Sequence, residues 1–469
     1  MDRPDSSAPL RELAGWTLAS SPEYSNPLVT TQAKHLLLDS VACALAALAA
    51  PSPRRVAQLI ADLGGAPQCS VIGESTQTSI TNAVLMNGAL VRSLDFNDVQ
   101  FFVKEGELSV AGHCSDNIPV ALAVGEKFGC DGAAILAAIV MAYEIFGRLR
   151  NLMPFSSAWD GTSVSALVAA AVYGRLAKLD VDRQAHALAL AATRCATPSV
   201  VRWGKLSGAK NLANSLIAQS GVQAAMLAER GVTGPLEVLS HRGGLHQVFD
   251  PQLGLESLWA PQTGTPFIMT SNIKPYACIG TAQAAIAAAL ELHPIVKDRL
   301  DEISHIDVVM ADLPMIRKQQ GESERQFPRT REAADHSFTF LPAVAMAEGE
   351  MTDRQFRDRR WEMPDMQRLI SVTELSVDSA LAARAPTNMP CRIRVSFADD
   401  SIVEQECLYH PGHSFPDRGL DVQVVQEKFR RIARQCLSDD KVEIVSDEVM
   451  ALDAGRVDRL MAILRDARR

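Results

Sequence analysis

The sequence predicts a mainly α protein, in which a large all-helical domain is interrupted by a smaller α+β domain. Apolar residues recur at helical spacing through the first 240 residues, strand-like alternation begins after about residue 265, and amphipathic helices return near the end. A chain of 469 residues is also too long for one compact core. We therefore expect residues 1–265 and 411–469 to form the helical domain and residues 266–410 to form the inserted domain.

The first part of the chain contains seven segments with the apolar periodicity of helices. Some of them, such as residues 133–147 (AAILAAIVMAYEIFG), are apolar on nearly every face, which is typical of helices buried on all sides. Their alanine and glycine residues should allow neighbouring helix axes to approach closely. Gly231 follows the last segment and is placed to end that helix. The segments are residues 30–50, 82–94, 117–128, 132–148, 162–179, 182–192 and 209–230.

The inserted domain is predicted from alternating segments. Residues 302–310 (EISHIDVVM) and 370–377 alternate like strands. Residues 391–397 and 402–409 do the same on either side of ADDS, a sequence typical of a hairpin turn. The cleft between two such domains is the default position for a ligand. Further helices are expected over residues 273–292, 332–351, 420–437 and 455–467.

Composition and charge exclude several classes of protein. The net charge of −9 argues against a nucleic-acid-binding face, so the positive charges for an anionic ligand must lie within a pocket. The nine cysteines are scattered without a CxxC pair, which fits a reducing cytosol better than a disulfide scaffold or a structural zinc site. The N-terminus lacks the pattern of a signal peptide, and the longest apolar stretches are too short to span a bilayer. We therefore expect a cytoplasmic protein that binds neither nucleic acid nor membrane.

Two carboxylates and a histidine follow an apolar helical run. Residues 87–98 (NGALVRSLDFND) contain Asp95 and Asp98, and His113 follows in the sequence GHCSDN after a segment expected to form a polar loop. Acidic groups at the end of a buried run need a partner or a function, and imidazole suits acid–base catalysis near neutral pH. Asp98 could equally cap the next helix or pair with an arginine. The residues SDN after His113 have the composition of an N-terminal cap for a helix over residues 118–128.

Cations precede two other apolar helices. Arg202 and Lys210 lie in RWGKLSGAK, and Lys210 begins an almost uncharged helix, so it is a candidate anion ligand at a helix N-terminus. Lys274 and Tyr276 flank a proline, which favours an extended segment with both side chains on one face. A lone lysine such as Lys274 can equally be a solvated surface charge.

Asp160 and His336 each stand at the entrance of an apolar helix. For Asp160, in WDGT, a helix N-cap is the favoured interpretation. For His336, in REAADHSF, a hydrogen-bonded structural histidine is favoured. The sequence contains no HExxH pair, phosphate-binding glycine loop or GxSxG elbow. A metal-free site of lysine, histidine and aspartate is what remains.

In their order along the chain, these motifs make the sequence similar to the MmgE/PrpD family, whose best-known members are 2-methylcitrate dehydratases. The resemblance implies a large all-helical domain, a smaller α+β lid domain, a homodimer, and a site with no metal or organic cofactor. It also implies a small di- or tricarboxylate substrate, and it puts the family's active-site groups at Asp95, His113, Lys210 and Lys274. The matching segments are MNGALVRSLDFND, GHCSDNIPVALAVGE, WDGTSVSALVAAAVYGRLAKLD, GAKNLANSLIAQSGVQAAMLAERGVTGP, IKPYACIGTAQAAI and REAADHSFTFLPAVAMAEG.

The chain departs from the family pattern at four positions. Gly161 and Phe340 stand where many members have a histidine and a tyrosine. Val99 replaces a threonine of the decarboxylases, and Gln283 replaces a histidine that often follows the lysine motif. These departures argue against decarboxylation of cis-aconitate and leave the 2-methylcitrate substrate open.

The sequence is therefore interpreted as a metal-independent hydro-lyase of the 2-methylcitrate dehydratase type, acting on a small di- or tricarboxylate. Proton abstraction beside a carboxylate builds negative charge, which Lys210 and Lys274, with Arg202, would stabilise. His113 would be the general base or acid, and Asp95 would orient it or handle the second proton. The alternatives are an isomerase or epimerase, a decarboxylase, and a non-catalytic carboxylate-binding homologue. Substrate contacts are expected from Arg202, Tyr276, Asp160 and His336.

Overall fold

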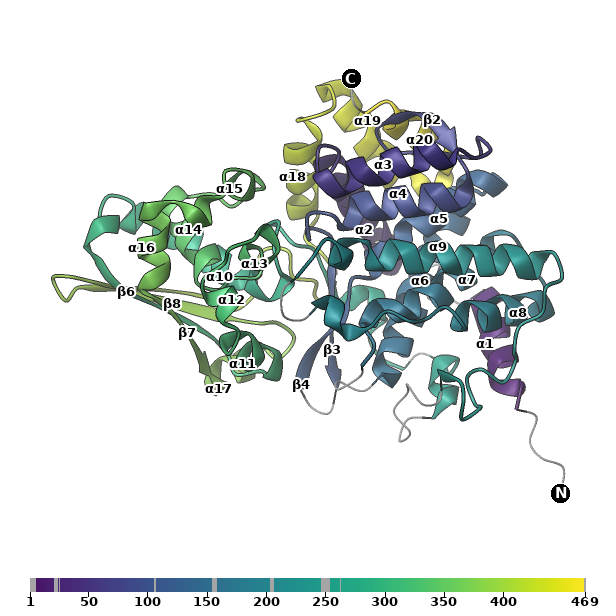
Figure 1. Cartoon of the computed structure of the whole chain (residues 1–469), viewed down its shortest axis with the longest axis horizontal. Coiled ribbons are helices and arrows are strands. Elements are labelled where there is room, and N and C mark those ends of the chain that lie inside the picture. Colours follow the sequence, from purple (N-terminus) through teal and green to yellow (C-terminus); the bar gives the residue numbers. More distant parts are fainter. Residues whose placement is uncertain are drawn as a thin grey trace.

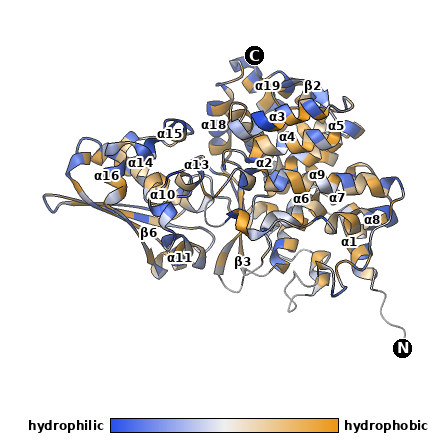
Figure 2. Ribbon diagram, in the orientation of Figure 1, coloured by the Kyte–Doolittle hydropathy of each residue, from blue (hydrophilic) through white to orange (hydrophobic). Residues whose placement is uncertain are grey.

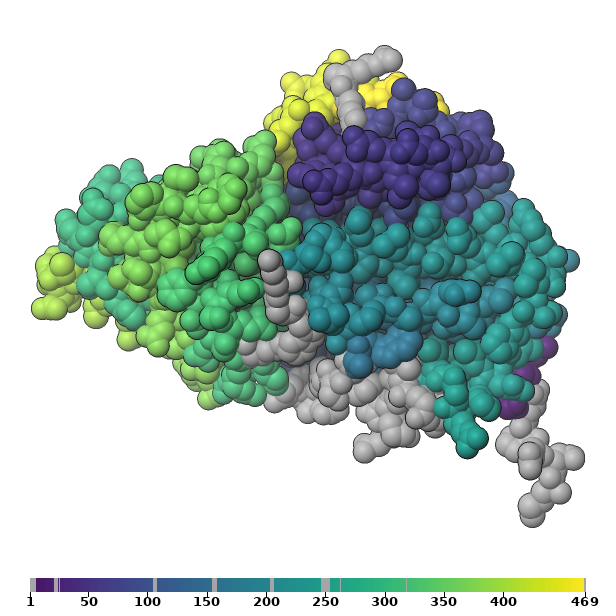
Figure 3. Space-filling model, in the orientation of Figure 1, coloured from purple at the N-terminus to yellow at the C-terminus, as the bar shows by residue number. Residues whose placement is uncertain are grey.

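The computed structural model of the chain is mostly helical, with small sheets. Its buried apolar residues form two clusters, and Figure 1 shows two bodies that meet near strand β3 (Val99–Lys104). In the space-filling view of Figure 3, the second body, coloured green, lies against the teal and purple helices of the first. The structure describes residues 6–20, 24, 26–104, 107–153, 158–202, 206–245, 254–261 and 263–467.

The first cluster is a helical bundle formed by the N-terminal part of the chain and its last three helices. Its helices are α1 (Ala8–Leu18), α2 (Pro27–Ala46), α3 (Pro51–Leu63), α4 (Ile80–Arg92), α5 (Ile118–Phe128), α6 (Gly132–Leu152), α7 (Ser165–Leu176), α8 (Val181–Ala192), α9 (Ala209–Glu229), α18 (Val422–Ala433), α19 (Asp439–Met450) and α20 (Val457–Arg465). Figure 2 shows how strongly apolar residues are concentrated in these helices. Small residues allow close packing, because a Cβ atom on Gly221 of α9 would lie only 2.3 Å from the carbonyl oxygen of Ala166 on α7.

The second cluster is a four-stranded sheet with helices packed on it. The strands are β6 (Ile303–Ala311), β7 (Thr373–Asp378), β8 (Cys391–Phe397) and β9 (Ile402–Cys407), and the helices are α10 (Gln283–Val296), α11 (Pro314–Gln320), α12 (Ser323–Gln326), α13 (Arg331–Ala334), α14 (Phe340–Glu348), α15 (Arg354–Arg357), α16 (Pro364–Ser371) and α17 (Ser379–Arg384). The strand order is β7-β6-β8-β9, with β6 parallel to β7 and antiparallel to β8. The predicted hairpin of β8 and β9 is confirmed, and Asp400 in its turn has a left-handed φ of 63°.

A hairpin stands where the sequence was expected to form a polar loop between Asp98 and His113. Its strands β3 and β4 pair antiparallel, and the side chains of Val99 and Phe101 pack into the second cluster. The expectation of a loop was wrong because it overlooked this alternating apolar segment. The hairpin therefore joins the two bodies and brings its two ends together. Strand β4 spans Glu107–Gly112. Strand β5 (Ser271–Asn272) pairs with the other edge of β3, so the order in this sheet is β4-β3-β5. Strands β1 (Cys69–Val71) and β2 (Glu74–Thr78) form a separate hairpin.

Two of the predicted helices differ clearly from the structure. Residues 273–279 are not helical, and α10 begins only after them. The expected helix over residues 332–351 is divided into α13 and α14, because the Ser337 hydroxyl accepts a hydrogen bond from the Phe340 amide at 3.1 Å. Such local side-chain bonds compete with the continuation of a helix. The turn that results carries His336.

The expectation that every apolar stretch is too short to span a bilayer was wrong for helix α6, which has the length and hydropathy to cross one. The same holds for α2 and α3 if this pair, bent by 85°, formed one span. In the most apolar window of α6, 83% of the residues are buried inside the protein. That burial is typical of a core helix, and the bundle accounts for its apolar composition.

A buried ion pair ties the C-terminal helices to the N-terminal ones. The Lys428 ammonium on α18 lies 2.6 Å from the Asp39 carboxylate on α2, and both side chains are almost fully buried. The same ammonium donates a hydrogen bond to the carbonyl oxygen of Phe96 at 2.8 Å. The C-terminal return therefore supports the loop that follows α4.

Replacing Lys428 with alanine should lower the free energy of unfolding by about 3–5 kcal/mol, because Asp39 is then buried without its partner. Urea unfolding followed by circular dichroism measures this loss, with the exposed Lys297→Ala as the matched control. Combining Lys428→Met with Asp39→Asn should recover most of the stability. A Lys428→Ala protein as stable as the control would contradict the role of the pair.

Candidate active site

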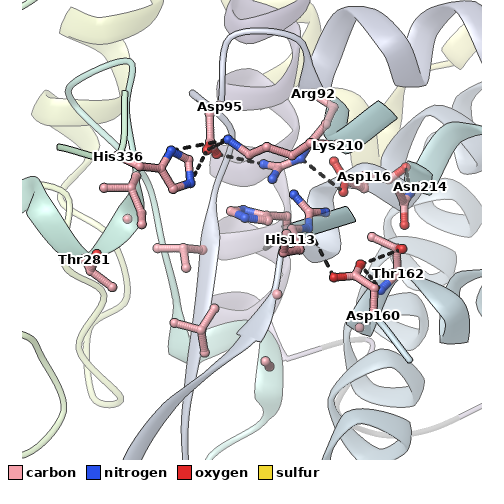
Figure 4. Close-up of a pocket in the computed structure, with 18 of the residues that line it drawn as sticks. Arg92, Asp95, His113, Asp116, Asp160, Thr162, Lys210, Asn214, Thr281 and His336 are labelled. Atoms are coloured by element: carbon pink, nitrogen blue, oxygen red, sulfur yellow. Dashed lines mark hydrogen bonds and ion pairs between the residues drawn. The ribbon is translucent and has the colours of Figure 1, made fainter. Parts of the chain in front are cut away.

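A cavity of about 270 Å³ lies between the two bodies. The bundle supplies most of its charged lining, and the second body supplies residues such as Thr281, Met315 and Arg325. Figure 4 shows that the labelled side chains from both bodies converge on this space. The titratable residues of the lining are Arg92, Asp95, His113, Asp116, Arg150, Asp160, Arg202, Lys210, Arg325 and His336.

Asp95 occupies a strained backbone position just after α4. Its φ of 49° lies in the left-handed region, which is unfavourable for a residue with a side chain. The Lys274 ammonium donates to the Asp95 carbonyl oxygen at 2.6 Å and also to its carboxylate at 2.6 Å. These two bonds from Lys274, which is not among the described cavity-lining residues, stabilise the strained backbone of Asp95. They also fix the position of its carboxylate in the cavity wall.

The Asp95 carboxylate is surrounded by cations. Arg92 and Lys210 each donate to it at 2.9 Å, in addition to Lys274, and all four side chains are almost fully buried. Burial by itself would raise the pKa of Asp95, but Lys210, Lys274 and Arg92 together hold that pKa well below its ordinary value. Asp95 is therefore ionised at neutral pH, which argues against the proton-transfer role that the sequence left open.

Among the described residues, one group of three side chains that can coordinate metals lies close enough together to hold a metal ion: Asp95, Asp335 and His336. However, the Lys210 ammonium already lies 2.9 Å from the carboxylate of Asp95 and 3.6 Å from that of Asp335. A divalent cation at this point would be repelled by the Lys210 ammonium and by the Lys274 ammonium, which lies 2.6 Å from the Asp95 carboxylate. This donor set therefore does not suit a metal ion while both lysines are charged.

His113 begins the turn after β4 and lines the cavity. Its Nδ1 lies 2.5 Å from the carbonyl oxygen of Asp98, and because a carbonyl can only accept, Nδ1 carries the proton. Burial, reinforced by Arg92 and Lys274, lowers the pKa of His113 well below its ordinary value. The ring is therefore neutral with an unprotonated Nε2, which is the form that a general base requires.

Asp98 has a structural position, as its capping interpretation allowed. Its carboxylate accepts hydrogen bonds from the Ser115 hydroxyl at 2.6 Å and from the Tyr143 hydroxyl at 2.8 Å. Burial raises the pKa of Asp98 to about 6. The residue closes the base of the β3–β4 hairpin and thereby fixes the position of His113.

The cap predicted for the helix over residues 118–128 is replaced by a 3-10 turn. Asn117 precedes α5 but makes no side-chain capping bond, and its amide donates instead to the carbonyl of Cys114 at 3.3 Å. Asp116 accepts from Asn97 at 2.9 Å and lines the cavity. Burial raises the pKa of Asp116 to about 6, so part of this carboxyl is protonated near neutral pH. Sequence reasoning treated Asp116 only as a cap, whereas the structure makes it a candidate acid.

His336 lies in the turn between α13 and α14 and faces the same group of charges (Figure 4). Its Nδ1 contacts the Asp335 carboxylate, and its Nε2 lies 3.7 Å from the Asp95 carboxylate. Burial and the nearby Lys210 lower the pKa of His336 to about 4. The residue therefore has the hydrogen-bonded partner of a structural histidine and also a place in the cavity lining.

Asp160 caps a 3-10 turn (Gly161–Val164), as the sequence favoured. Its carboxylate accepts from the Thr162 amide at 3.0 Å and also lies 3.2 Å from Arg202. Burial would raise the pKa of Asp160, but Arg202 and Thr162 lower it below its ordinary value. Both members of the Asp160–Arg202 pair line the cavity.

Lys274 and Tyr276 do not share a face of the cavity. Lys274 is fully buried behind Asp95 and acts on the site through that carboxylate. Tyr276 packs against the second apolar cluster and is absent from the described lining of the cavity. The two side chains separate because the backbone from residue 274 to residue 279 turns instead of extending.

Sequence reasoning missed several cavity residues. Arg92 was within the quoted motif, and its position at the end of a buried helix was a usable signal. Arg150 at the end of α6 and Arg325 on α12 gave none, since isolated arginines are common on helix ends. Asn214, which donates to the Asp116 carbonyl at 3.2 Å, was likewise not a predicted site residue.

Comparison with known proteins covers both bodies. The profile of the MmgE/PrpD N-terminal domain matches residues 11–256, and the profile of the MmgE/PrpD C-terminal domain matches residues 276–453. A cis-aconitate decarboxylase-like protein of Aspergillus oryzae is 23% identical to the chain, over 97% of the chain and 96% of that protein. The cis-aconitate decarboxylase of Aspergillus terreus is 23% identical, over 91% of the chain and 89% of that protein. The human cis-aconitate decarboxylase is 25% identical, over 77% and 74% respectively. The resemblance inferred from the motifs is thereby confirmed.

The lowered pKa of His336, about 4 against an ordinary value of 6.5, predicts a pH-dependent stability. Because the unfolded chain takes up this proton first as the pH falls, the stability is complete above about pH 6.5 and decreases toward pH 4. At pH 5 this residue lowers the free energy of unfolding by about 2 kcal/mol relative to neutral pH. His336→Gln should reduce the dependence of urea unfolding on pH across this range, to which His410 and His413 also contribute. The exposed His305→Gln should leave that dependence unchanged. Equal slopes for the His336 variant and the unaltered protein would exclude His336 as the source.

Proposed function

The chain belongs to the MmgE/PrpD family, and we propose that it is a metal-independent lyase that removes water from a small di- or tricarboxylate. One observation carries the proposal: a neutral histidine, His113, lines a buried cavity whose walls are rich in cations. Among the described lining residues, five are arginine or lysine and three are aspartate. That excess of positive charge suits a substrate with more than one carboxylate.

The first step of the proposed reaction is removal of a proton from the carbon beside a substrate carboxylate. His113 is the base, since its Nδ1–H bond to the Asp98 carbonyl leaves Nε2 free to accept the proton. The negative charge then moves onto the substrate carboxylate. Lys210 and Arg92 line the cavity and stabilise that charge, and Lys274 acts indirectly by fixing Asp95.

The second step is departure of the hydroxyl group as water, which needs a proton donor. Asp95 is excluded from this role because its three cations keep it ionised. Asp116 is the proposed donor, since it lines the cavity and burial raises its pKa to about 6. A base that is neutral and an acid that is partly protonated can both operate near pH 6.

Decarboxylation is the second candidate, because the relatives named above are cis-aconitate decarboxylases or similar to them. The same cations would stabilise the carbanion left after loss of carbon dioxide, and Asp116 would protonate it. Epimerisation would require only proton removal and return. A carboxylate-binding homologue without turnover is the fourth outcome to be tested.

Three further features belong to the proposal. The helical domain comprises residues 1–265 and 411–469, with residues 266–410 as an α+β lid over the cavity. Support comes from the two apolar clusters, although residues as far as Ala277 pack with the bundle and Val99 and Phe101 pack with the second cluster. The protein is cytoplasmic, and it is a homodimer.

The decisive experiment incubates chelator-treated protein with a panel of hydroxylated di- and tricarboxylates, and with cis-aconitate, in deuterated water. Ultraviolet absorbance reports a new conjugated double bond, NMR reports deuterium exchange, and carbon dioxide release reports decarboxylation. Absorbance growth supports the hydro-lyase, whereas gas release from cis-aconitate supports the decarboxylase. Exchange without either change means epimerisation, and loss of activity on chelation would contradict metal independence.

His113→Asn should lower kcat by about 10²–10⁴-fold, because the variant lacks the base but keeps the cations that bind the substrate. KM should change far less than kcat. The matched control is His305→Asn, at an exposed position of β6 remote from the cavity lining. Near-normal turnover by the His113 variant would overturn the assignment of the base.

The rate should also fall as the pH rises above about 6, because Asp116 must be protonated to donate and burial sets its pKa near that value. Asp116→Asn should remove this pH dependence and lower kcat by about 10²–10⁴-fold. A pH–rate profile of kcat measures both effects. An Asp116→Asn enzyme that retains the descending limb would show that another group is the acid.

A further inference from the structure

Arg150, at the end of α6, presents its guanidinium to the cavity beside the turn that begins at Gly161. Its Nε donates to the carbonyl oxygen of Ala111 at 2.6 Å, and its Nη1 lies 3.2 Å from the sulfur of Met153. Sulfur is a weak acceptor, and Nη2 has no hydrogen-bond partner within the described residues. The outer edge of the guanidinium, formed by Nη1 and Nη2, therefore keeps most of its donor capacity.

The other arginines of the described lining each have a carboxylate partner. Arg92 pairs with Asp95 at 2.9 Å, Arg202 with Asp160 at 3.2 Å, and Arg325 with Glu322 at 2.5 Å. Arg150 has no carboxylate within 4.0 Å across residues 6–153 and the other described ranges, and Asp160 influences it only from farther away. A half-buried cation without a counterion is costly unless a ligand supplies one.

Gly161 makes room for this guanidinium. A Cβ atom at position 161 would lie 2.8 Å from Nε, 2.9 Å from Cζ and 3.3 Å from Nη2 of Arg150. The backbone there is not in the left-handed region, so an alanine would fit the chain itself and conflict only with the arginine. The observed position of the Arg150 guanidinium therefore requires that residue 161 has no side chain.

We infer that Arg150, whose guanidinium occupies the space that Gly161 leaves open, binds a carboxylate of the substrate remote from the reacting carbon, through Nη1 and Nη2. The inference rests on the proposed function and deepens it, because it requires a substrate with a carboxylate beyond the one activated near His113 and Lys210. The planar fork of an arginine matches a carboxylate in two parallel hydrogen bonds, which a lysine cannot reproduce. Arg150 and Gly161 thus determine which polycarboxylates fit.

The test is calorimetric binding of tricarballylate, a saturated tricarboxylate without a hydroxyl group, to the full-length protein. Arg150→Gln should weaken binding by about 10- to 100-fold, the usual effect of losing a hydrogen-bonded charge. Arg150→Lys keeps the positive charge but loses the planar guanidinium, so its affinity for tricarballylate should lie between those of the unaltered protein and Arg150→Gln. Glutarate lacks the central carboxylate of tricarballylate, and 2-ethylsuccinate has a methyl group in place of a terminal one. The loss of affinity caused by Arg150→Gln should be smaller for whichever of the two lacks the carboxylate that Arg150 binds.

Gly161→Ala tests the geometry directly. It should weaken tricarballylate binding as Arg150→Gln does, and the double variant should bind no more weakly than Arg150→Gln alone, because both changes remove the same contact. Gly15→Ala is the matched control, since a Cβ atom at that position of α1 meets nothing within 4 Å. Thermal unfolding of each variant separates loss of binding from loss of folding.

Each result has a distinct meaning. Binding by Arg150→Gln at the affinity of the unaltered protein would overturn the inference while leaving the proposed function intact. Unaltered affinity of Gly161→Ala, or additive losses in the double variant, would contradict the shared space of Arg150 and Gly161. If the unaltered protein bound none of the three probes, the proposed function would fail and this inference with it.

Discussion

The buried Asp95 carboxylate stands among the charged groups of Arg92, Lys210 and Lys274, and the geometry of the cavity depends on that cluster. The three cations come from α4, from α9 and from the segment before α10, so one carboxylate ties together parts of the chain that lie far apart in sequence. Removal of the carboxylate would leave three buried cations without compensation, a change that typically costs several kcal/mol. The left-handed backbone at Asp95 is tolerated because Lys274 binds both its carbonyl and its side chain.

The same cluster explains how the proposed proton-transfer groups can coexist with so many charges. His113 and His336 stay neutral because burial and the surrounding cations disfavour a further positive charge. Asp116 lies farther from the cations, 4.0 Å from Arg92 at its nearest described ion-pair contact, and burial raises its pKa to about 6. Carboxyl groups in one cavity thus differ in protonation because of their distance from fixed positive charge, which is how one site can hold both an ionised anchor and an acid.

The sequence predicted the parts of this arrangement that depend on local order. Apolar periodicity located the long buried helices, alternation located the β8–β9 hairpin, and the motif around Asp95 and His113 indicated a group of side chains that the structure does bring together. The sequence did not predict the features that depend on contacts between residues far apart in the chain. The β3–β4 hairpin forms because Val99 and Phe101 find apolar partners in the other body, and Tyr276 leaves the cavity because its segment turns. The guanidinium of Arg150 has room in its position because residue 161, eleven residues along the chain, is a glycine.

The two bodies contribute differently to the cavity. The bundle and the hairpin supply the titratable groups Asp95, His113 and Asp116, whereas the second body adds Thr281, Met315, Gln319 and Arg325 to the lining. His336 is the exception, since it comes from the second body and reaches the Asp95 cluster. The site is therefore complete only when the two bodies are in contact, and the Asp95–Lys210–His336 group links them in addition to the apolar contacts of Val99 and Phe101. In the proposed reaction, a substrate carboxylate in this space would meet charges already fixed by the fold, so little reorganisation would be needed as negative charge develops.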